Sequence, residues 1–278
     1  MHGHLDIVAG RAANEETVLR RQSFAPPIHV SKPHHDAGWL VVNLASPTPG
    51  LLAGDRVDVR VAVETGAHLL LTAPSASRIH AMAEGYAELT QYYHIAAGGV
   101  LDIWPEYLIP QKDARYQQRT RIEVEPGGTL LWTETVAPGR TARGEVFEFT
   151  ELQLVSDILH GTRPLVRERY VLTRDGAAVA SLRRKFSQAY YASVVAVAPE
   201  PAVDVAELKL LHALHAPESL WLGATRLSAS AVAVKILAAD SPSLRAAVAS
   251  VRAILFRWLR LEPASLRRIT GAPVAATF

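Results

Sequence analysis

Hydrophobic and polar residues alternate along much of the first two thirds of the chain. The alternation is strict over residues 57–63 and returns over residues 121–125, and a period of two is that of a half-buried β-strand. Shorter apolar runs between turn residues predict further strands. The predicted β segments are 39–44, 57–63, 121–125, 130–135, 145–159 and 166–186. This part of the chain is therefore predicted to be mainly β.

A turn followed by an apolar strand recurs three times within this part. Its turn glycines, Gly66, Gly98 and Gly127, are spaced by 32 residues (66 to 98) and 29 residues (98 to 127). Glycine suits such turns because it tolerates positive φ. Regular spacing of this kind is typical of stacked β coils, but ordinary hairpins in a β-sandwich also place glycines between strands. Both interpretations remain open from the sequence.

The last third of the chain has a different pattern. Asp204 and Glu207 are spaced like a capping box, and an apolar helical face follows them. Two strand-like runs come next, at residues 219–227 and 231–237. Helices and strands are therefore predicted to mix in this part.

A longer helix is predicted to begin near Ser241, as its N-cap, with Pro242 in the first turn. The apolar stripe that follows at helical spacing consists of Leu244, Val248, Val251, Leu255 and Trp258. Arg245 and Arg252 lie off this stripe. We interpret the stripe as core packing rather than a partner groove.

The composition is that of a globular protein, with 49% hydrophobic and 20% charged residues. Because no low-complexity linker divides the chain, we predict one domain over residues 1–278, with a β body at about 23–190 and a mixed helix and strand part at 191–278. The net charge of +2 is too balanced for a nucleic-acid partner. There is no apolar signal segment and no apolar run of about 18 residues, so no membrane partner is expected.

Several kinds of chemistry lack their usual residues. The absence of cysteine excludes disulfides, thiolate metal ligands and a cysteine nucleophile, and it fits a cytoplasmic location. The P-loop, Rossmann, zinc-protease and serine-hydrolase signatures are also missing. We therefore expect a protein that is not an enzyme and that holds no tightly bound cofactor.

A glycine-bounded loop, residues 49–56, leads into the first alternating strand. Gly50 and Gly54 permit tight turns, and Asp55 can accept backbone N–H groups in an Asx-type turn. The alternative role for Asp55 is a carboxylate that lines a polar path, where a cation finds oxygen ligands. The sequence leaves both roles open.

Residues 138–145 are predicted to connect two strands as a hairpin with arginines at its tip. Such a hairpin places Glu134 roughly opposite Glu148. Paired carboxylates repel each other unless a cation or an arginine lies between them. Arg140 or Arg143 is the simplest such group, and a bound cation is the alternative.

Five segments, in chain order, carry a resemblance to a known family. They are 49–56, 71–79, 101–106, 139–145 and 161–165. Their motif residues are Gly50, Gly54, Arg56, Thr72, Arg78, Trp104, Pro105, Glu106, Gly139, Arg140 and Gly144. Together they resemble the urease accessory protein family UreD, called UreH in some organisms, over about residues 23–268. The chain departs from the family pattern at Pro49, Ala53 and Pro74, and its stretch around Trp104 is one residue shorter.

The resemblance implies a stacked two-sheet β-helix-like body with additional C-terminal α-helices. It also implies that the protein acts with UreF and the GTPase UreG on apo-urease, as a scaffold and metallochaperone that delivers nickel to the two-nickel centre. Nickel(II) is then transient cargo, and weak sites along an internal tunnel suit transit because Ni²⁺ binds most protein sites tightly. The first candidates for this path are Asp55, Glu145 and Glu134.

Two other functions also fit the sequence. A carbohydrate-active enzyme on a β scaffold would use a carboxylate pair such as Glu134 and Glu148, about 5–10 Å apart. A pure adaptor would hold the same proteins together without handling metal.

Overall fold

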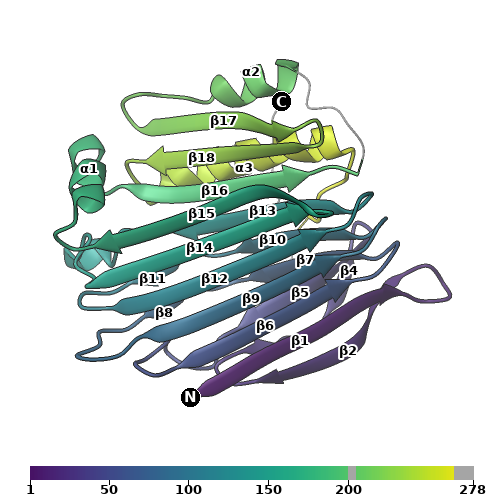
Figure 1. The fold of residues 1–278 in the computed structure, drawn as a ribbon, viewed down its shortest axis with the longest axis horizontal. Helices are drawn as coiled ribbons and strands as arrows, with labels where there is room; N and C mark the ends of the chain where they lie inside the picture. The colour runs from purple at the N-terminus through teal and green to yellow at the C-terminus, as the bar shows by residue number, and fades with distance from the viewer. Residues whose placement is uncertain (200–204, 266–278) are drawn as a thin grey trace.

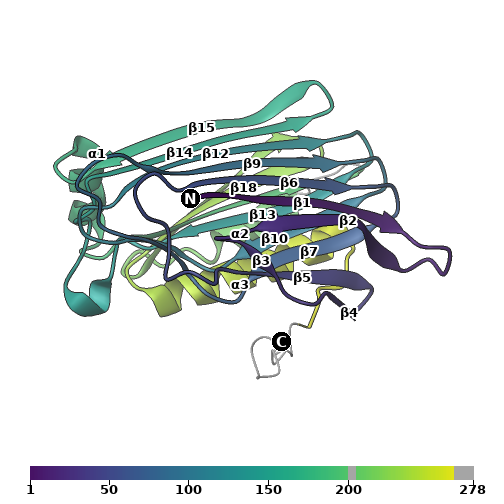
Figure 2. The same cartoon turned by 90° about the horizontal axis from the view of Figure 1, so that it is seen from below.

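Two β-sheets lie face to face, and helices cover the outer face of one of them (Figures 1 and 2). The computed structural model describes residues 1–199 and 205–265. The seven-stranded sheet contains, in spatial order, β15 (Arg163–Thr173), β14 (Glu151–His160), β12 (Arg115–Val124), β9 (Ala87–Ile95), β6 (Arg56–Val63), β1 (His2–Arg11) and β2 (Thr17–Ala25).

The second sheet has eleven strands. Its main path runs through β17 (Leu220–Ser228), β18 (Ala231–Ala238), β16 (Tyr190–Val197), β13 (Thr129–Val136), β10 (Val100–Pro105), β7 (His68–Ala73), β5 (Trp39–Ala45) and β3 (His29–Val30). The short strands β4 (His34–Asp36), β8 (Ser77–Ile79) and β11 (Leu108–Pro110) attach to this path. The helices are η1 (Thr141–Arg143), α1 (Ala177–Lys185), α2 (Val205–His212) and α3 (Ser241–Leu259).

The chain passes back and forth between the two sheets in parallel coils. Parallel pairing joins His68 to Val100 and Val100 to Thr129, offsets of 32 residues (68 to 100) and 29 residues (100 to 129). These are the spacings of the turn glycines. The turns also stack, because the amide of Gly98 donates to the carbonyl of Gly127 at 2.9 Å. The predicted β-helix-like body is thus confirmed, and the hairpin interpretation of the repeat is wrong.

Three predicted segments need correction. The β body starts at His2 rather than near residue 23, because β1 pairs in parallel with β6. The segment 166–186 is a strand only as far as Thr173, and its remainder contains α1, whose alanine, leucine and arginine residues are strong helix formers. Similarly, β14 begins at Glu151, and the residues before it form an irregular loop with the short 3₁₀ turn η1.

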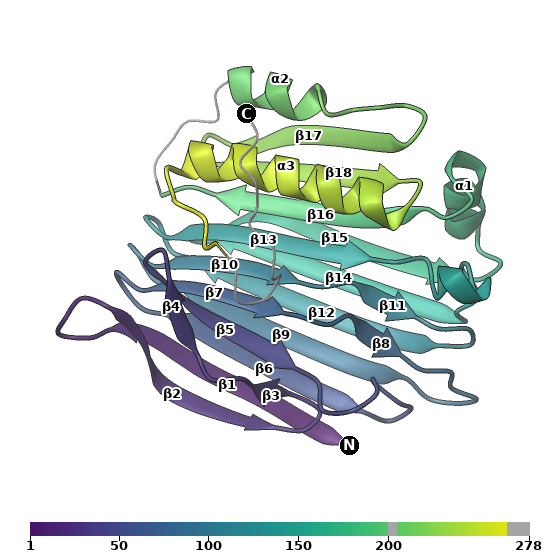
Figure 3. The same cartoon turned by 180° about the vertical axis from the view of Figure 1, so that it is seen from behind.

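The C-terminal part extends the eleven-stranded sheet and then covers it. Strands β16, β18 and β17 pair antiparallel, and α3 packs across the outer face of β16 and β18 (Figure 3). The N-cap of α3 is Asp240, not Ser241, because the Asp240 carboxylate accepts the amide of Ser243 at 2.7 Å. Asp204, and with it the predicted capping box, lies outside the described residues. No helix in the described ranges is long and apolar enough to cross a membrane.

Helix α3 also carries a buried charge toward the sheet. The predicted stripe is buried at Leu244, Val248, Val251 and Leu255. Arg252, off that stripe, is nevertheless only 4% exposed. Its guanidinium donates to Asp102 Oδ2 on β10 at 2.6 Å and to Thr133 Oγ1 on β13 at 2.9 Å. The centre of the Trp104 ring lies 4.1 Å from the guanidinium carbon.

Candidate functional site

A layer of polar side chains crosses the core between the two sheets. We call it the polar layer. It consists of Gln91, Gln118, Thr120, Ser156 and Glu168 from the seven-stranded sheet and of Glu134, Ser193 and Lys235 from the eleven-stranded sheet. Backbone register explains the alignment: Ser156 pairs with Thr120 on one side and Glu168 on the other, while Ser193 pairs with Glu134 and Lys235.

The polar layer separates two apolar parts of the core. Along β14, every second residue is directed inward, and the sequence of these positions is Leu152, Leu154, Ser156 and Ile158. Leu152 and Leu154 belong to a cluster near α1, whereas Ile158 belongs to the larger cluster toward the glycine turns. The layer is therefore built by one polar inward position on most of its strands, and by two successive ones, Gln118 and Thr120, on β12.

Hydrogen bonds connect the layer across both sheets. Gln118 Nε2 donates to Glu134 Oε1 at 2.5 Å, which joins β12 to β13 in the opposite sheet. The Tyr116 hydroxyl donates to Gln118 Oε1 at 3.0 Å, and Thr120 Oγ1 donates to Gln91 Oε1 at 2.8 Å. Because a buried polar group without a partner costs free energy, these bonds make a polar interior tolerable.

Glu134 is the most deeply buried carboxylate of the layer, at 8% exposure. Burial raises the pKa of Glu134 to about 7, against the hydrogen bond from Gln118 and the positive charge of Lys235, which lower it. The charge of Glu168 raises it further. Near neutral pH this carboxyl group is therefore present in both its neutral and its ionised form, and the ionised form is stabilised by a nearby cation.

The raised pKa predicts a pH-dependent stability. Glu134 binds its proton more tightly in the folded state than in the unfolded state, so its contribution to stability is lost as pH rises from 4.5 to about 7. The loss is about 3 kcal/mol. We expect Glu134→Gln to flatten the pH dependence of the unfolding free energy and to be more stable than the unmodified protein at pH 8.

Urea unfolding at pH 5, 6.5 and 8 measures this effect. Glu84→Gln is the matched control, because Glu84 is an exposed carboxylate in the loop before β9. The control should keep the original pH dependence. An equally steep dependence in Glu134→Gln would show that Glu134 ionises normally in the folded protein.

The far end of the polar layer is closed by an ion pair. Lys235 Nζ on β18 lies 2.5 Å from Glu168 Oε2 on β15 and 2.7 Å from Ser193 Oγ. The Tyr170 hydroxyl donates to the same carboxylate oxygen at 3.3 Å. The side chains of Lys235 and Glu168 are 32% and 22% exposed, so this end of the layer reaches solvent beside the edge strand β15.

Two cavities adjoin the layer. The larger, about 310 Å³, lies under the loop that contains Gly50 and next to Arg78, and it extends inward to Gln91 and Tyr116. The smaller, about 220 Å³, is apolar and is lined by Tyr170 among others. The larger cavity thus connects the surface near two motif residues with the hydrogen-bonded side chains around Glu134.

Asp55 lies outside the polar layer. It is buried, its Oδ2 accepts the amide of Leu52 at 2.8 Å, and its Oδ1 lies 2.7 Å from the amino group of Met1. Asp55 thus accepts a backbone N–H within its own loop, as expected, but the donor lies three residues before it, so the contact is not an Asx-type turn. The place of Asp55 on a metal path stays a prediction.

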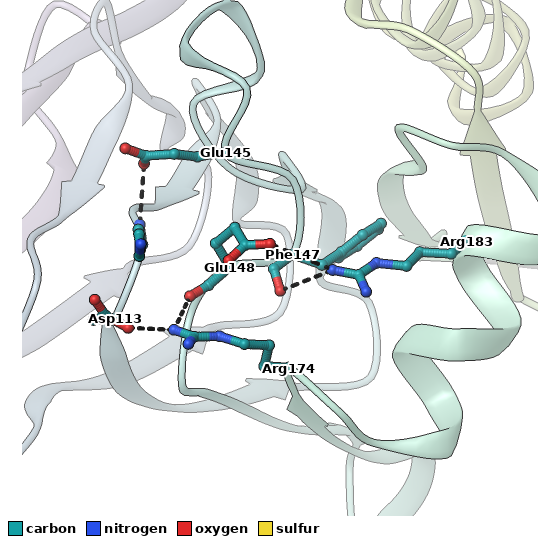
Figure 4. A network of polar contacts seen from close by, with 7 residues as sticks. Asp113, Glu145, Phe147, Glu148, Arg174 and Arg183 are labelled. Carbon is teal, nitrogen blue, oxygen red and sulfur yellow. Dashed lines mark hydrogen bonds and ion pairs between the residues drawn. The ribbon is translucent and has the colours of Figure 1, made fainter.

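Glu145 lies at the opposite end of the coils from the glycine turns, in a loop that other polar contacts hold (Figure 4). Its carboxylate pairs with Arg140, whose Nε lies at 2.7 Å, and accepts the amide of Lys112 at 3.1 Å. The hydrogen bond from Arg140 holds the pKa of Glu145 below its usual value. The arginine expected to compensate a carboxylate in this loop is thus Arg140, but the carboxylate is Glu145.

The expected pairing of Glu134 with Glu148 is wrong. The intervening loop does not form a hairpin, because β13 and β14 belong to different sheets. Glu134 lies opposite Ser193 instead. Glu148 belongs to the loop network of Figure 4, where Arg183 lies 3.8 Å from its carboxylate and Arg174 contacts its carbonyl.

The other motif residues mainly shape loops and helix contacts. Gly50 has a φ of 150°, and a β-carbon there would overlap the carbonyl oxygen of Arg78. Thr72 Oγ1 donates to the carbonyl of Trp104 at 2.6 Å, and Glu106 forms a two-pronged ion pair with Arg245 of α3. The remaining motif residues lie in turns or strands of the same coils: Gly54, Arg56, Pro105, Gly139 and Gly144.

Sequence reasoning found Glu134 but missed most of its surroundings. Gln118, Ser156, Ser193 and Lys235 were not among the candidates. The available signal was a polar residue at an inward position of an otherwise apolar strand face, as at Ser193 within β16. Within residues 1–199 and 205–265, no group of three or more His, Cys, Asp or Glu side chains is arranged to hold a metal ion.

Comparison with known proteins gives a consistent family. The model of the UreD urease accessory protein family matches residues 1–271. The urease accessory protein UreD of Opitutus terrae is 34% identical over 270 residues, which cover 95% of this chain and 98% of that protein. UreD of Alkalilimnicola ehrlichii is 30% identical over 80% of this chain and 75% of its own length. UreH of Helicobacter pylori is 28% identical over 58% of this chain and 61% of its own length. The chain therefore belongs to the UreD family of urease accessory proteins.

Proposed function

We propose that this protein assists the maturation of urease as a non-catalytic scaffold and metallochaperone. In this role it binds UreF, UreG and apo-urease in the cytoplasm and passes nickel(II) toward the urease active site through its polar layer. The observation that carries the proposal is Glu134, a buried carboxylate in a hydrogen-bonded layer that a cavity connects to the surface.

The chemistry of the layer suits transit. A divalent cation between two sheets needs oxygen ligands, and the layer provides carboxylate, amide and hydroxyl oxygens between two apolar clusters. Its ligands are spread along the layer, so no single position holds the ion tightly. A protein that stored nickel would instead gather several histidine or carboxylate ligands at one point.

We order the three predicted path residues by their contacts. Glu134 is first because it faces the interior network. Asp55 and Glu145 follow, since the oxygens of Asp55 are engaged by Leu52 and Met1 and those of Glu145 by Arg140 and Lys112. We keep both as candidates for the two ends of the path.

The test is urease activation in cells that lack their own UreD. We expect Glu134→Gln to lower both the nickel content and the specific activity of urease by about tenfold at limiting nickel, a factor equivalent to about 1.4 kcal/mol. The amide retains the shape and the acceptor of the carboxylate but loses its charge. Glu84→Gln is the control, and co-purification with urease checks that complexes still form.

If Glu134→Gln joins the complexes and loads nickel normally, nickel does not depend on Glu134, and the adaptor function is the better description. In the same assay, normal nickel loading of urease by the Asp55→Ala variant would show that Asp55 does not contribute to the nickel path. The carbohydrate-active alternative has no support from the geometry, because Glu134 is buried in the layer and Glu148 lies in the loop of Arg183.

A further inference from the structure

We propose that the ammonium of Lys235 occupies a cation position of the polar layer, so that a divalent cation enters there only by displacing it. This inference rests on the proposed function, because it assigns Lys235 the role of keeping that path open and weakly binding. Lys235 is in this sense a built-in competitor for the cargo.

The contacts of Lys235 are those of a cation among oxygen ligands. Its Nζ lies 2.5 Å from Glu168 Oε2 and 2.7 Å from Ser193 Oγ. Ser193 is the register partner of both Lys235 and Glu134, so all three side chains lie at one level of the sheet. The charge of Lys235 also acts on Glu134. One ammonium thus binds the Glu168 carboxylate directly and acts on Glu134 through its charge.

Charge balance explains why such a group is useful. With Glu134 and Glu168 ionised, one ammonium compensates one of the two negative charges, whereas one divalent cation compensates both. A divalent cation therefore competes well with the ammonium, and the two positive groups repel each other if both are present. Because the Lys235 side chain is 32% exposed, its flexible stem can carry the ammonium out to solvent.

The exchange also accounts for weak binding. Without Lys235, the Glu168 carboxylate and the Ser193 hydroxyl that now bind its ammonium would face an uncompensated position, with Glu134 in register beside Ser193, and a metal ion would bind there more firmly. With Lys235, the ion must displace an existing ion pair, and the returning ammonium helps to expel it. Transit through the layer requires this property.

The competing explanation is that the ion pair between Lys235 and Glu168 only holds the two sheets together. The ion pair links β18 of one sheet to the edge strand β15 of the other, and partly exposed pairs of this kind contribute little stability. If the ion pair is only structural, replacement of Lys235 causes a small loss of stability and no change in metal binding. If Lys235 competes with the metal ion, the same replacement increases metal binding.

The experiment is equilibrium dialysis of the full chain against nickel chloride. We expect Lys235→Met, which keeps the apolar stem and removes the charge, to bind one nickel ion per chain at least about tenfold more tightly than the unmodified protein. Lys235→Arg should bind as weakly as the unmodified protein because it restores the positive charge. Lys209→Met, which removes an exposed charge from α2, is the matched control. The double variant Lys235→Met with Glu168→Gln should lose the gained affinity.

The outcomes separate this inference from the proposed function. Unchanged nickel affinity in a folded Lys235→Met variant overturns the role of Lys235, as does a gain that survives Glu168→Gln. Urease activation is the second measurement. A Lys235→Met variant that gains nickel affinity and still activates urease normally at limiting nickel would show that Lys235 does compete with a metal ion. In that case the proposal that nickel passes through the polar layer is rejected.

Discussion

Replacement of Asp102 by alanine is expected to lower the free energy of unfolding by about 4 kcal/mol, because it leaves the Arg252 guanidinium buried without its carboxylate. Both side chains are almost fully buried, at 2% and 4% exposure. Arg252 links α3 to β10 and β13, and burial raises the pKa of Asp102 while Arg252 opposes that rise. The loss of one partner therefore weakens the contact of the helix with the sheet.

The double variant Asp102→Leu with Arg252→Met is the decisive comparison. Removing both charges together leaves apolar side chains of similar volume, and such replacements are often close to neutral. We expect the double variant to remain within about 1.5 kcal/mol of the unmodified protein. Urea unfolding monitored by circular dichroism measures each variant. The two single variants, Asp102→Leu and Arg252→Met, are measured alongside it. If the double variant loses as much free energy of unfolding as the two single variants together, the pair acts through packing and not through charge.

The coils could be predicted from the sequence because their cause is local. Turn glycines recur at the spacing of the coils, and each strand needs only its own alternation to be recognised. Helix α1 was missed because its nine residues follow β15 closely and bury only Val179, so the apolar stripe of an amphipathic helix is absent.

The polar layer could not be predicted because its members meet only through the register of distant strands. Gln118 and Glu134 bond across the two sheets, and Lys235 reaches Glu168 from 67 residues away. An inward serine or glutamine looks like an ordinary interruption of an apolar pattern when each strand is considered alone. The false hairpin had the same origin: β13 and β14 are close in sequence, but the coil sends them to different sheets and leaves Glu148 in the loop between them.

The motif glycines also differ in ways that the sequence does not reveal. Gly139 and Gly144 flank the same short turn, η1. Gly139 has a φ of 145°, and a β-carbon on it would overlap the carbonyl oxygen of Glu145. Gly144 has a φ of 75°, in the left-handed region, and nothing lies within 4 Å of the position of its β-carbon. Only the first position excludes a side chain for reasons of space.

Gly139→Ala is therefore expected to lower the free energy of unfolding by about 4 kcal/mol, from backbone strain together with the overlap. Gly144→Ala, the matched control, should lower the free energy of unfolding by about 1 kcal/mol, because an alanine in the left-handed region meets no other atoms there and only its backbone conformation is unfavourable. Urea unfolding of both variants measures the difference. Equal losses would mean that the loop shifts to accommodate the new methyl group, and the Arg140–Glu145 contact would then not depend on the backbone at Gly139. A large difference would instead assign this part of the family motif to the shape of the loop, independently of any metal path.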